Sequence, residues 1–455
     1  MFTPMVTRPR DWVDLDSGVY LDPALASLTP LVRKTSGKQR GMIRSAIRTG
    51  RMQPAIAALN TIQRTPYAIN EYTMAAVEWC WEMNIQPGST FPARQRMPHH
   101  KYPDDYEELN DELKHFHRKK AHEVRMHNRD IDSGISLMHS DLKTAKDLQQ
   151  HECFYLPHSF DFRGRVYPIP HFNQHRNDHI KSLFLFSERK RIGERGAYWI
   201  AVQVATAGDF DRMSKASFAE RVEWVMDNAE RLALIGNDFE ATYDDGNTIC
   251  WSKADKPFQF LAACREFFGF WQQGIDYCSG LGIALDGSNS GIQHFAAQSK
   301  TETDGALVNL IPADRPQDIY QAVADKVTSS LEKDTSNEIA SEWLRFGITR
   351  KHVKRNVMTY CYSSGHYGFT EQLMTDLMKP LHTEVLSGLR DKHPFDDPHK
   401  AAMLLSSENM NAIRIIIKGA ADGMRFYQKI ANILAKRGDT MSWFTPIGFP
   451  VDNCF

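Results

Sequence analysis

The sequence lacks the features that mark membrane and secreted proteins. No stretch approaches the roughly 20 apolar residues that cross a bilayer, and the N-terminal MFTPMVTRPRDWVDLDSG has prolines and acids where a signal peptide is apolar. The seven cysteines are scattered and never form C-x-x-C, which argues against a disulfide framework or a structural zinc site. We therefore expect a cytoplasmic protein that contacts no membrane.

Several enzyme signatures are missing as well. There is no G-x-x-x-x-G-K-[ST] phosphate loop, no G-x-G-x-x-G, no H-E-x-x-H and no G-x-S-x-G. The sequence therefore gives no indication of a P-loop ATPase, a Rossmann dehydrogenase, a zinc protease or a common hydrolase. The formal net charge is only −1, so any nucleic acid would have to be held by local basic patches.

What the sequence does contain is typical of a large globular protein. Its 455 residues exceed one ordinary core, and 42% of them are hydrophobic. Helical periodicity dominates, interrupted by strand and turn patterns near 153–170, 283–286 and 441–455. The fold class is predicted to be mixed α/β and predominantly helical. The charged stretch 104–150 is predicted to be an exposed helical arm.

Asp286 is the first candidate for a functional residue. In IALDGSNSG it follows three apolar residues and precedes a run of small ones, which predicts a carboxylate at the end of a buried strand, where a ligand can approach closely. Such an aspartate suits a metal site. The same pattern is also that of a turn former or helix cap.

A second candidate is the stretch RKHVKRNVMTYCY at 350–362. On a helix, Arg350, Lys354, Met358 and Tyr362 form one stripe of about 18 Å, with cations at the N-terminal end and an aromatic ring at the other. A nucleoside triphosphate has a similar length and the same division into charge and ring. The alternative is a solvated cationic face with Tyr362 in the core.

Two further basic segments are candidates for phosphate contacts. In DFRGRVYP, Arg163 and Arg165 flank Gly164 and could present two guanidinium groups. The alternative, which the motif alone slightly favours, is a salt bridge from Asp161 to Arg163 or Arg165 in an ordinary hairpin. The run at 114–129 could follow a nucleic-acid backbone or could be a solvated helix face. Its candidate contacts are Arg118, Lys119, Lys120 and Arg125.

Taken in order, these stretches resemble the phage-type single-subunit DNA-dependent RNA polymerases, a family of bacteriophages and mitochondria. The resemblance extends over about 300 residues and includes further stretches between and beyond the candidates. The matching stretches are DFRGRVYP at 161, KADKPFQFLA at 253, LDGSNSGIQHF at 285, ALVNLIP at 306, QDIY at 317, RKHVKRNVMTYCYSSGHYGF at 350 and TPIGFPV at 445.

The resemblance implies roles for the candidate residues. Asp286, with the carbonyl of Gly287, would bind the two Mg²⁺ ions of a nucleotidyl transfer site. Arg350 and Lys354 would bind the triphosphate, and Tyr362 would close on the incoming base pair. Two further sets complete the implied site: Tyr320 near the ribose and metal, and Arg163 and Arg165 facing the primer or substrate sugar.

The resemblance also implies a right-handed polymerase with thumb, palm and fingers. The expected parts are 1–65 as a remnant of the N-terminal promoter-binding domain, 66–150 as a thumb-like arm, 151–314 as palm with a helical insertion at about 190–276, and 315–455 as fingers. DNA template, RNA product and nucleoside triphosphates are the implied partners.

Two departures from the family pattern stand out. Ser363 follows the tyrosine where the family has glycine, and none of the 18 histidines precedes an aspartate, so the His-Asp-Ser turn with the second catalytic carboxylate is missing. The sequence stops in strand-turn material with nothing after it to pair with. We therefore expect a split or truncated polymerase whose missing palm segment comes from a second polypeptide.

Two other functions remain open. A related DNA polymerase shares the lysine-to-tyrosine helix and would prefer deoxynucleotides. A catalytically incomplete DNA-binding remnant would keep the basic arm and show salt-sensitive DNA affinity without nucleotide binding.

Overall fold

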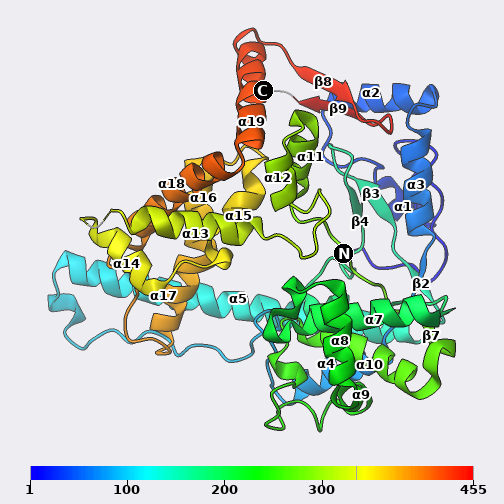
Figure 1. Ribbon diagram of the computed structural model, residues 1–455, viewed down its shortest axis with the longest axis horizontal. Helices are drawn as coiled ribbons and strands as arrows, with labels where there is room; N and C mark the ends of the chain where they lie inside the picture. The colour runs from blue at the N-terminus through cyan, green and yellow to red at the C-terminus, as the bar shows by residue number, and fades with distance from the viewer. Residues whose placement is uncertain (1, 335, 454–455) are drawn as a thin grey trace. The chain divides into compact units, whose positions relative to one another are not determined.

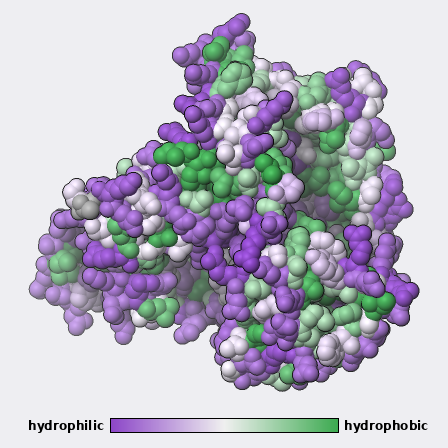
Figure 2. Space-filling view, in the orientation of Figure 1, coloured by the Kyte–Doolittle hydropathy of each residue, from purple (hydrophilic) through white to green (hydrophobic). Residues whose placement is uncertain are grey.

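The computed structural model describes residues 2–334 and 336–453, which form two compact units. Unit 1 comprises 1–284 and 438–455, and unit 2 comprises 285–437. The predicted fold class is confirmed, because helices dominate both units and the strands are short and antiparallel (Figure 1). None of the described helices is both long and apolar enough to cross a bilayer, and the face in Figure 2 is mostly hydrophilic with small apolar patches.

Unit 1 contains two hydrophobic cores. The larger core lies among the helices around α10 and the sheet β2-β1-β5. The helices of unit 1 are α1 (Pro23–Ser27), α2 (Gly37–Arg48), α3 (Gln53–Gln63), α4 (Glu71–Glu82), α5 (Asp111–Gln149), α6 (Asp178–Lys181), α7 (Gly193–Gly208), α8 (Phe218–Asp227), α9 (Ala229–Asn237) and α10 (Pro257–Gln273). The strands are β1 (Pro66–Ile69), β2 (Phe154–Tyr155), β3 (His158–Phe160), β4 (Val166–Pro168), β5 (Phe184–Phe186), β6 (Lys190–Arg191), β7 (Cys278–Ser279), β8 (Met441–Phe444) and β9 (Pro450–Asn453).

The smaller core of unit 1 joins segments from both ends of the sequence. Residues of α2 and α3 pack with Phe449 and Val451 of the β8–β9 hairpin, which lies beside α2 in Figure 1. Gly448 makes this contact possible, since a Cβ there would lie 2.0 Å from the carbonyl oxygen of Arg51. The strand-turn pattern predicted at 441–455 is thus confirmed for the described residues, and its two strands pair with each other.

Helix α5 corrects the prediction of an exposed arm. Its buried residues recur at spacings of three, four and seven, and Met138, Ala145 and Leu148 belong to the larger core. A 39-residue helix with one apolar stripe has a packed face even when its other faces carry many charged residues. The prediction underestimated this stripe because seven-residue gaps between apolar positions look sparse in a charged sequence.

The described residues of unit 2 form helices and loops but no strand, and they share one core of their own. Helices α13, α15 and α16 all pack against α18 (Figure 1). The elements are α11 (Ser290–Ser299), α12 (Glu302–Leu307), α13 (Ile319–Leu331), α14 (Glu338–Phe346), α15 (Arg350–Tyr360), α16 (His366–Leu373), the π-helix η5 (Met374–Met378), α17 (Lys379–Leu386), α18 (Pro398–Ile416) and α19 (Lys418–Lys436).

Two buried histidines make the stability of unit 1 pH-dependent. His179 lies between Phe91 and Phe258, with ring centroids 5.1 and 6.2 Å away, and burial lowers its pKa to about 4. Burial also lowers the pKa of His158 to about 4. In the unfolded chain, with a histidine pKa near 6.5, these side chains become protonated at a pH at which they are still neutral in the folded state. The free energy of unfolding therefore falls as pH drops from about 6.5 towards 4.

We expect each histidine to remove about 2 kcal/mol of unfolding free energy between pH 7 and pH 5. The variant His179→Leu should therefore lose about 2 kcal/mol less than the wild type over this range. Urea denaturation at both pH values measures the difference. Equal losses in the two proteins would show that His179 becomes protonated in the folded state.

Candidate nucleotide site in unit 2

The segment that carries Asp286 differs from its prediction. Residues 280–289 form no strand, and Asp286 is exposed, so the predicted buried strand is wrong. An apolar run forms a strand only when another strand accepts its backbone hydrogen bonds, and no described strand pairs with 283–286. The carboxylate Oδ1 accepts a hydrogen bond of 2.8 Å from the backbone N–H of Gly287.

Helix α15 begins at Arg350, as predicted, and presents the expected stripe. Arg350, Lys354 and Met358 lie on the helix, but the helix ends at Tyr360, so Tyr362 stands in the turn that follows. The buried residues of the helix are Val353, Asn356, Val357 and Tyr360. The predicted stripe is therefore helical over its first three members only, and Tyr362 is 55% exposed instead of lying in the core.

Tyr320, at the start of α13, connects the cationic stripe to the Asp286 segment. Arg350 and Lys354 lie 5.3 and 6.0 Å from the centre of its ring, within the range of cation–π attraction. Its hydroxyl donates a 2.8 Å hydrogen bond to the carbonyl of Ser288, two residues after Asp286. Burial raises the pKa of Tyr320, and the charges of Asp318 and Asp286 act in the same direction. The phenol therefore stays protonated and can act as this donor.

A second connection lies at the other end of α15. Gly291, in the first turn of α11, approaches Cys361 so closely that an added Cβ would be 2.7 Å from the Cβ of Cys361. The hydroxyls of Ser290 and Tyr362 are 3.5 Å apart. The small residues that follow Asp286 thus allow its segment to lie against the end of α15, and the predicted candidates of unit 2 share one surface.

Ser363 occupies a backbone conformation that favours glycine. Its φ is 65°, while its N–H and that of Ser364 bond back to the carbonyls of Tyr360 and Thr359, in the manner of a helix C-terminus. The departure from the family pattern at this position therefore places a strained residue beside Tyr362.

We expect Ser363→Gly to raise the unfolding free energy by about 0.5–1 kcal/mol, because relief of the left-handed strain exceeds the extra entropy that glycine loses on folding. Urea denaturation measures it. The matched control is Ser364→Gly, which should be destabilising because the Ser364 hydroxyl accepts a hydrogen bond from Gln372. A destabilised Ser363→Gly variant would contradict the assigned strain.

Two residues of this surface were missed by the sequence analysis. Asp318 accepts a 2.8 Å ion pair from Arg350 and also caps α13. Asn309 donates to Ser288 Oγ over 2.6 Å and binds both backbone groups of Gln317. A signal existed for Asp318, since an aspartate directly before an apolar periodic stretch is a typical N-cap; Asn309 gave none beyond its place in ALVNLIP.

Only part of a divalent metal site is present in these residues. Within the described chain, no three His, Cys, Asp or Glu side chains lie together in a group that could hold a metal ion. Asp286 is exposed and could supply one carboxylate. Mg²⁺ often takes one or two carboxylates and fills its other positions with water and substrate phosphates. The residues therefore fit a Mg²⁺ that is bound together with a nucleotide.

Arg163 and Arg165 belong to unit 1, on the turn between β3 and β4. The backbone N–H groups of both bond to Asp161 Oδ1 over 2.9 Å, and the Arg163 guanidinium pairs with Asp161 Oδ2 at 3.4 Å. The salt bridge to Asp161 that was the alternative interpretation is thus present for Arg163, while both arginine side chains remain exposed. Gly164 rests on the ring of Phe449, 3.1 Å from where its Cβ would be, so two of the matched motifs meet here.

The four basic residues predicted to contact nucleic acid lie on the first half of α5. Arg118 and Arg125 are exposed and, being seven residues apart, share a face of the helix. Lys119 and Lys120 point to other sides, and the Lys120 ammonium lies 6.0 Å from the ring of Phe116. Their contact with nucleic acid stays a prediction.

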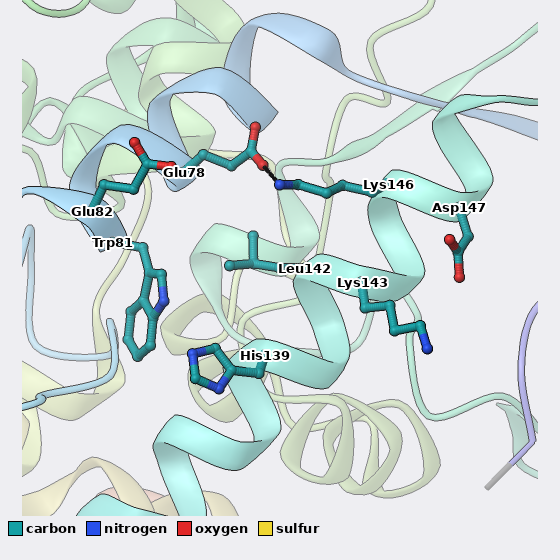
Figure 3. A pocket seen from close by; sticks show the side chains of 8 residues that line it. All are labelled: Glu78, Trp81, Glu82, His139, Leu142, Lys143, Lys146 and Asp147. Carbon is teal, nitrogen blue, oxygen red and sulfur yellow. Dashed lines mark ion pairs between the residues drawn. The ribbon is translucent and has the colours of Figure 1, made fainter.

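A hollow of about 380 Å³ lies between α4 and α5 in unit 1 (Figure 3). Trp81 and His139 meet edge to face at 5.5 Å in its wall, and Glu78 pairs with Lys146 at 2.5 Å. None of the predicted site residues lines it. It lies in unit 1, away from the residues of the candidate site in unit 2, so it gives no reason to move that site.

Comparison with known proteins shows the family to which the chain belongs. The family model for DNA-dependent RNA polymerase matches residues 190–454. The DNA-directed RNA polymerase of Enterobacteria phage T3 is 31% identical over 99% of this chain, and the T7 RNA polymerase of Escherichia phage T7 is 30% identical over 99%. The mitochondrial DNA-directed RNA polymerase of Neurospora crassa is 32% identical over 82% of it.

The chain belongs to the DNA-dependent RNA polymerase family, because the family model covers more than half of it. Within the family it is similar to the single-subunit enzymes of phages T3 and T7. It spans about half the length of these two relatives, 53% in each case, and 26% of the Neurospora enzyme.

Proposed function

We propose that this chain forms the nucleotide-binding part of a DNA-directed RNA polymerase that adds nucleoside triphosphates to RNA on a DNA template. The observation that carries the proposal is the connection through Tyr320, which joins the cations of α15 to the Asp286 segment. A triphosphate on Arg350 and Lys354 would have its base towards Tyr362 and its reacting end towards Asp286. Phage relatives support a role in viral transcription within the host cytoplasm.

Each residue would act through its charge or shape. Lys354 is exposed and would meet the triphosphate directly, while Asp318 holds the Arg350 guanidinium at 2.8 Å and so fixes its direction. Tyr362 would stack on the base. Asp286 and the carbonyl of Gly287 would hold Mg²⁺, which when bound supplies charge stabilisation for the attacking and leaving oxygens. By analogy with the family, Lys354 would also neutralise the negative charge of the departing pyrophosphate.

A two-metal site needs a second carboxylate, and the described residues around Asp286 do not provide it as part of a metal-binding group. We infer that it comes from residues outside this sequence, on a second polypeptide as the sequence predicts or in a longer chain. Elongation of RNA by the 455-residue chain alone, with template, Mg²⁺ and all four nucleotides, would refute this inference.

We also infer the polymerase architecture and its nucleic-acid contacts from the family. Unit 2 corresponds to most of the predicted fingers, α5 to the thumb, and the segments before 285 to the first part of the palm and the promoter-domain remnant. Arg163 and Arg165 would face the primer or substrate sugar, and the basic residues of α5 would follow the phosphate backbone. These contacts predict DNA affinity that falls steeply with salt.

Nucleotide binding tests the proposal without requiring the second carboxylate. We expect Lys354→Ala to weaken binding of a fluorescent ATP analogue with Mg²⁺ by about 10- to 100-fold, because a hydrogen bond to a charged group contributes about 1.5–3 kcal/mol. Fluorescence anisotropy measures the dissociation constant. Lys326→Ala is the matched control, since Lys326 is an exposed cation on α13 but faces away from Tyr320.

Equal affinity in the Lys354 variant and the wild type would contradict the proposal, as would an equal loss in both variants. The same titration with deoxynucleotides separates the alternatives. Tighter binding of deoxynucleotides would favour a DNA polymerase. Salt-sensitive DNA binding without nucleotide binding, unchanged by Asp286→Asn, would favour the incomplete remnant.

A further inference from the structure

A network of polar side chains lies behind α15, on the side opposite the cationic stripe. Asn356 is 1% exposed and accepts a 2.8 Å hydrogen bond from Asn409 of α18, which is fully buried. The Asn356 amide in turn donates to Gln372 of α16 over 2.9 Å. Three helices of unit 2 are therefore connected by side-chain amides within the core.

Gln372 extends this network to the turn that carries Tyr362. Its Nε2 donates to Thr359 Oγ1 over 3.1 Å and to Ser364 Oγ over 3.3 Å. These two residues stand on either side of Tyr362, one in the last turn of α15 and the other just after the turn. Gly368 leaves room for Ser364, because a Cβ there would lie 2.7 Å from its hydroxyl.

The chemistry of the network and the local backbone both indicate that Gln372 helps to fix the position of the turn that carries Tyr362. A buried polar network stabilises less than apolar packing of the same volume, but it selects one arrangement because each donor needs its own acceptor. The π-helix η5 begins two residues after Gln372. Its Asp376 pairs with Arg355 of α15 at 2.5 Å, so α15 is held at a second point. Segments of π-helix often occur at functional sites.

We propose that Gln372 is a positioning residue that fixes the turn 361–364 and thereby sets where the ring of Tyr362 meets the base of the incoming nucleotide. The second half of this statement rests on the proposed nucleotide site. Gln372 itself is only half-buried and touches the turn through Thr359 and Ser364, not through Tyr362. Its effect on nucleotide binding would therefore be indirect.

Hydrogen exchange of backbone amides tests the placement without any nucleotide. In Gln372→Leu, which keeps the volume and removes both donors, we expect the amides of 362–364 to exchange about tenfold faster, while those of α18 keep their rates. Gln372→Glu should fall between this variant and the wild type, because the hydroxyls of Thr359 and Ser364 can donate to a carboxylate. Gln321→Leu, on α13, is the matched control.

The second part of the test measures how tightly the same variants bind the fluorescent ATP analogue. Gln372→Leu should weaken binding about three- to tenfold, with partial recovery in Gln372→Glu. Unchanged exchange at 362–364, or equal acceleration in α18, would overturn the positioning role. Faster exchange with unchanged affinity would overturn its link to the nucleotide. If the wild type bound no nucleotide, the proposed function would fail, whereas the exchange result would still decide the role of Gln372 in the turn.

Discussion

Asp286→Asn is expected to reduce nucleotide incorporation by about 10³-fold, because loss of the carboxylate would weaken the proposed Mg²⁺ site, whose charge stabilisation would be worth several kcal/mol in the transition state. The substitution changes charge at an exposed position, so the fold should be unaffected. A primer-extension assay measures it, with the residues that carry the proposed second carboxylate supplied on a second polypeptide or in a longer chain.

Asp325→Asn is the matched control for this experiment. Asp325 is an exposed carboxylate on α13 that accepts a 2.7 Å hydrogen bond from Gln321. Its replacement should leave incorporation within about twofold of the wild type, as expected for a surface substitution worth less than 0.5 kcal/mol. If Asp286→Asn behaved like this control, Asp286 would not be a metal ligand.

Phe449→Ala should cost about 3–5 kcal/mol of unfolding free energy, which is typical of a fully buried phenylalanine. The ring is 0% exposed, lies 5.3 Å from that of Phe160, and supports Gly164 in the turn between β3 and β4. Urea denaturation followed by circular dichroism measures the loss. The Arg163–Arg165 turn should also become more mobile, since its support is removed.

An exposed residue of the same hairpin serves as the control for the buried Phe449. Ile447 lies in its turn and is 48% exposed, so Ile447→Ala should change stability by less than about 0.5 kcal/mol. A Phe449 variant as stable as the Ile447 variant would show that the hairpin is not part of the core of unit 1.

The sequence predicted best where the structure depends on local spacing. Helix α15 begins at the expected Arg350, and its buried face follows from apolar residues at helical intervals. The hairpin β3–β4 follows from a glycine between aromatic and β-branched residues, as the sequence indicated. Arg350, Lys354 and the carbonyl of Ser288, two residues after Asp286, all contact Tyr320, whereas the roles of these residues in a nucleotide site stay predictions.

Prediction was poorer where distant residues decide the outcome. Whether the residues before Asp286 form a strand depends on a pairing partner, which their own sequence does not specify. The partner of Arg350 is Asp318, 32 residues away, and Asn409 is 53 residues from Asn356. The partial burial of α5 has a similar cause, because its one apolar stripe is covered by other parts of unit 1.

The shared core of α2, α3 and the β8–β9 hairpin has a consequence for synthesis of the protein. A ribosome makes residues 12–59 of that core before unit 2, but Phe449 and Val451 emerge only after unit 2 has been made. Until then Trp12, Leu15 and Ile43 lack part of their apolar cover and are exposed to chaperones or to aggregation. Unit 2 contains none of this hairpin and could fold first, so residues 12–59 would reach their final packing after unit 2 although they are made before it.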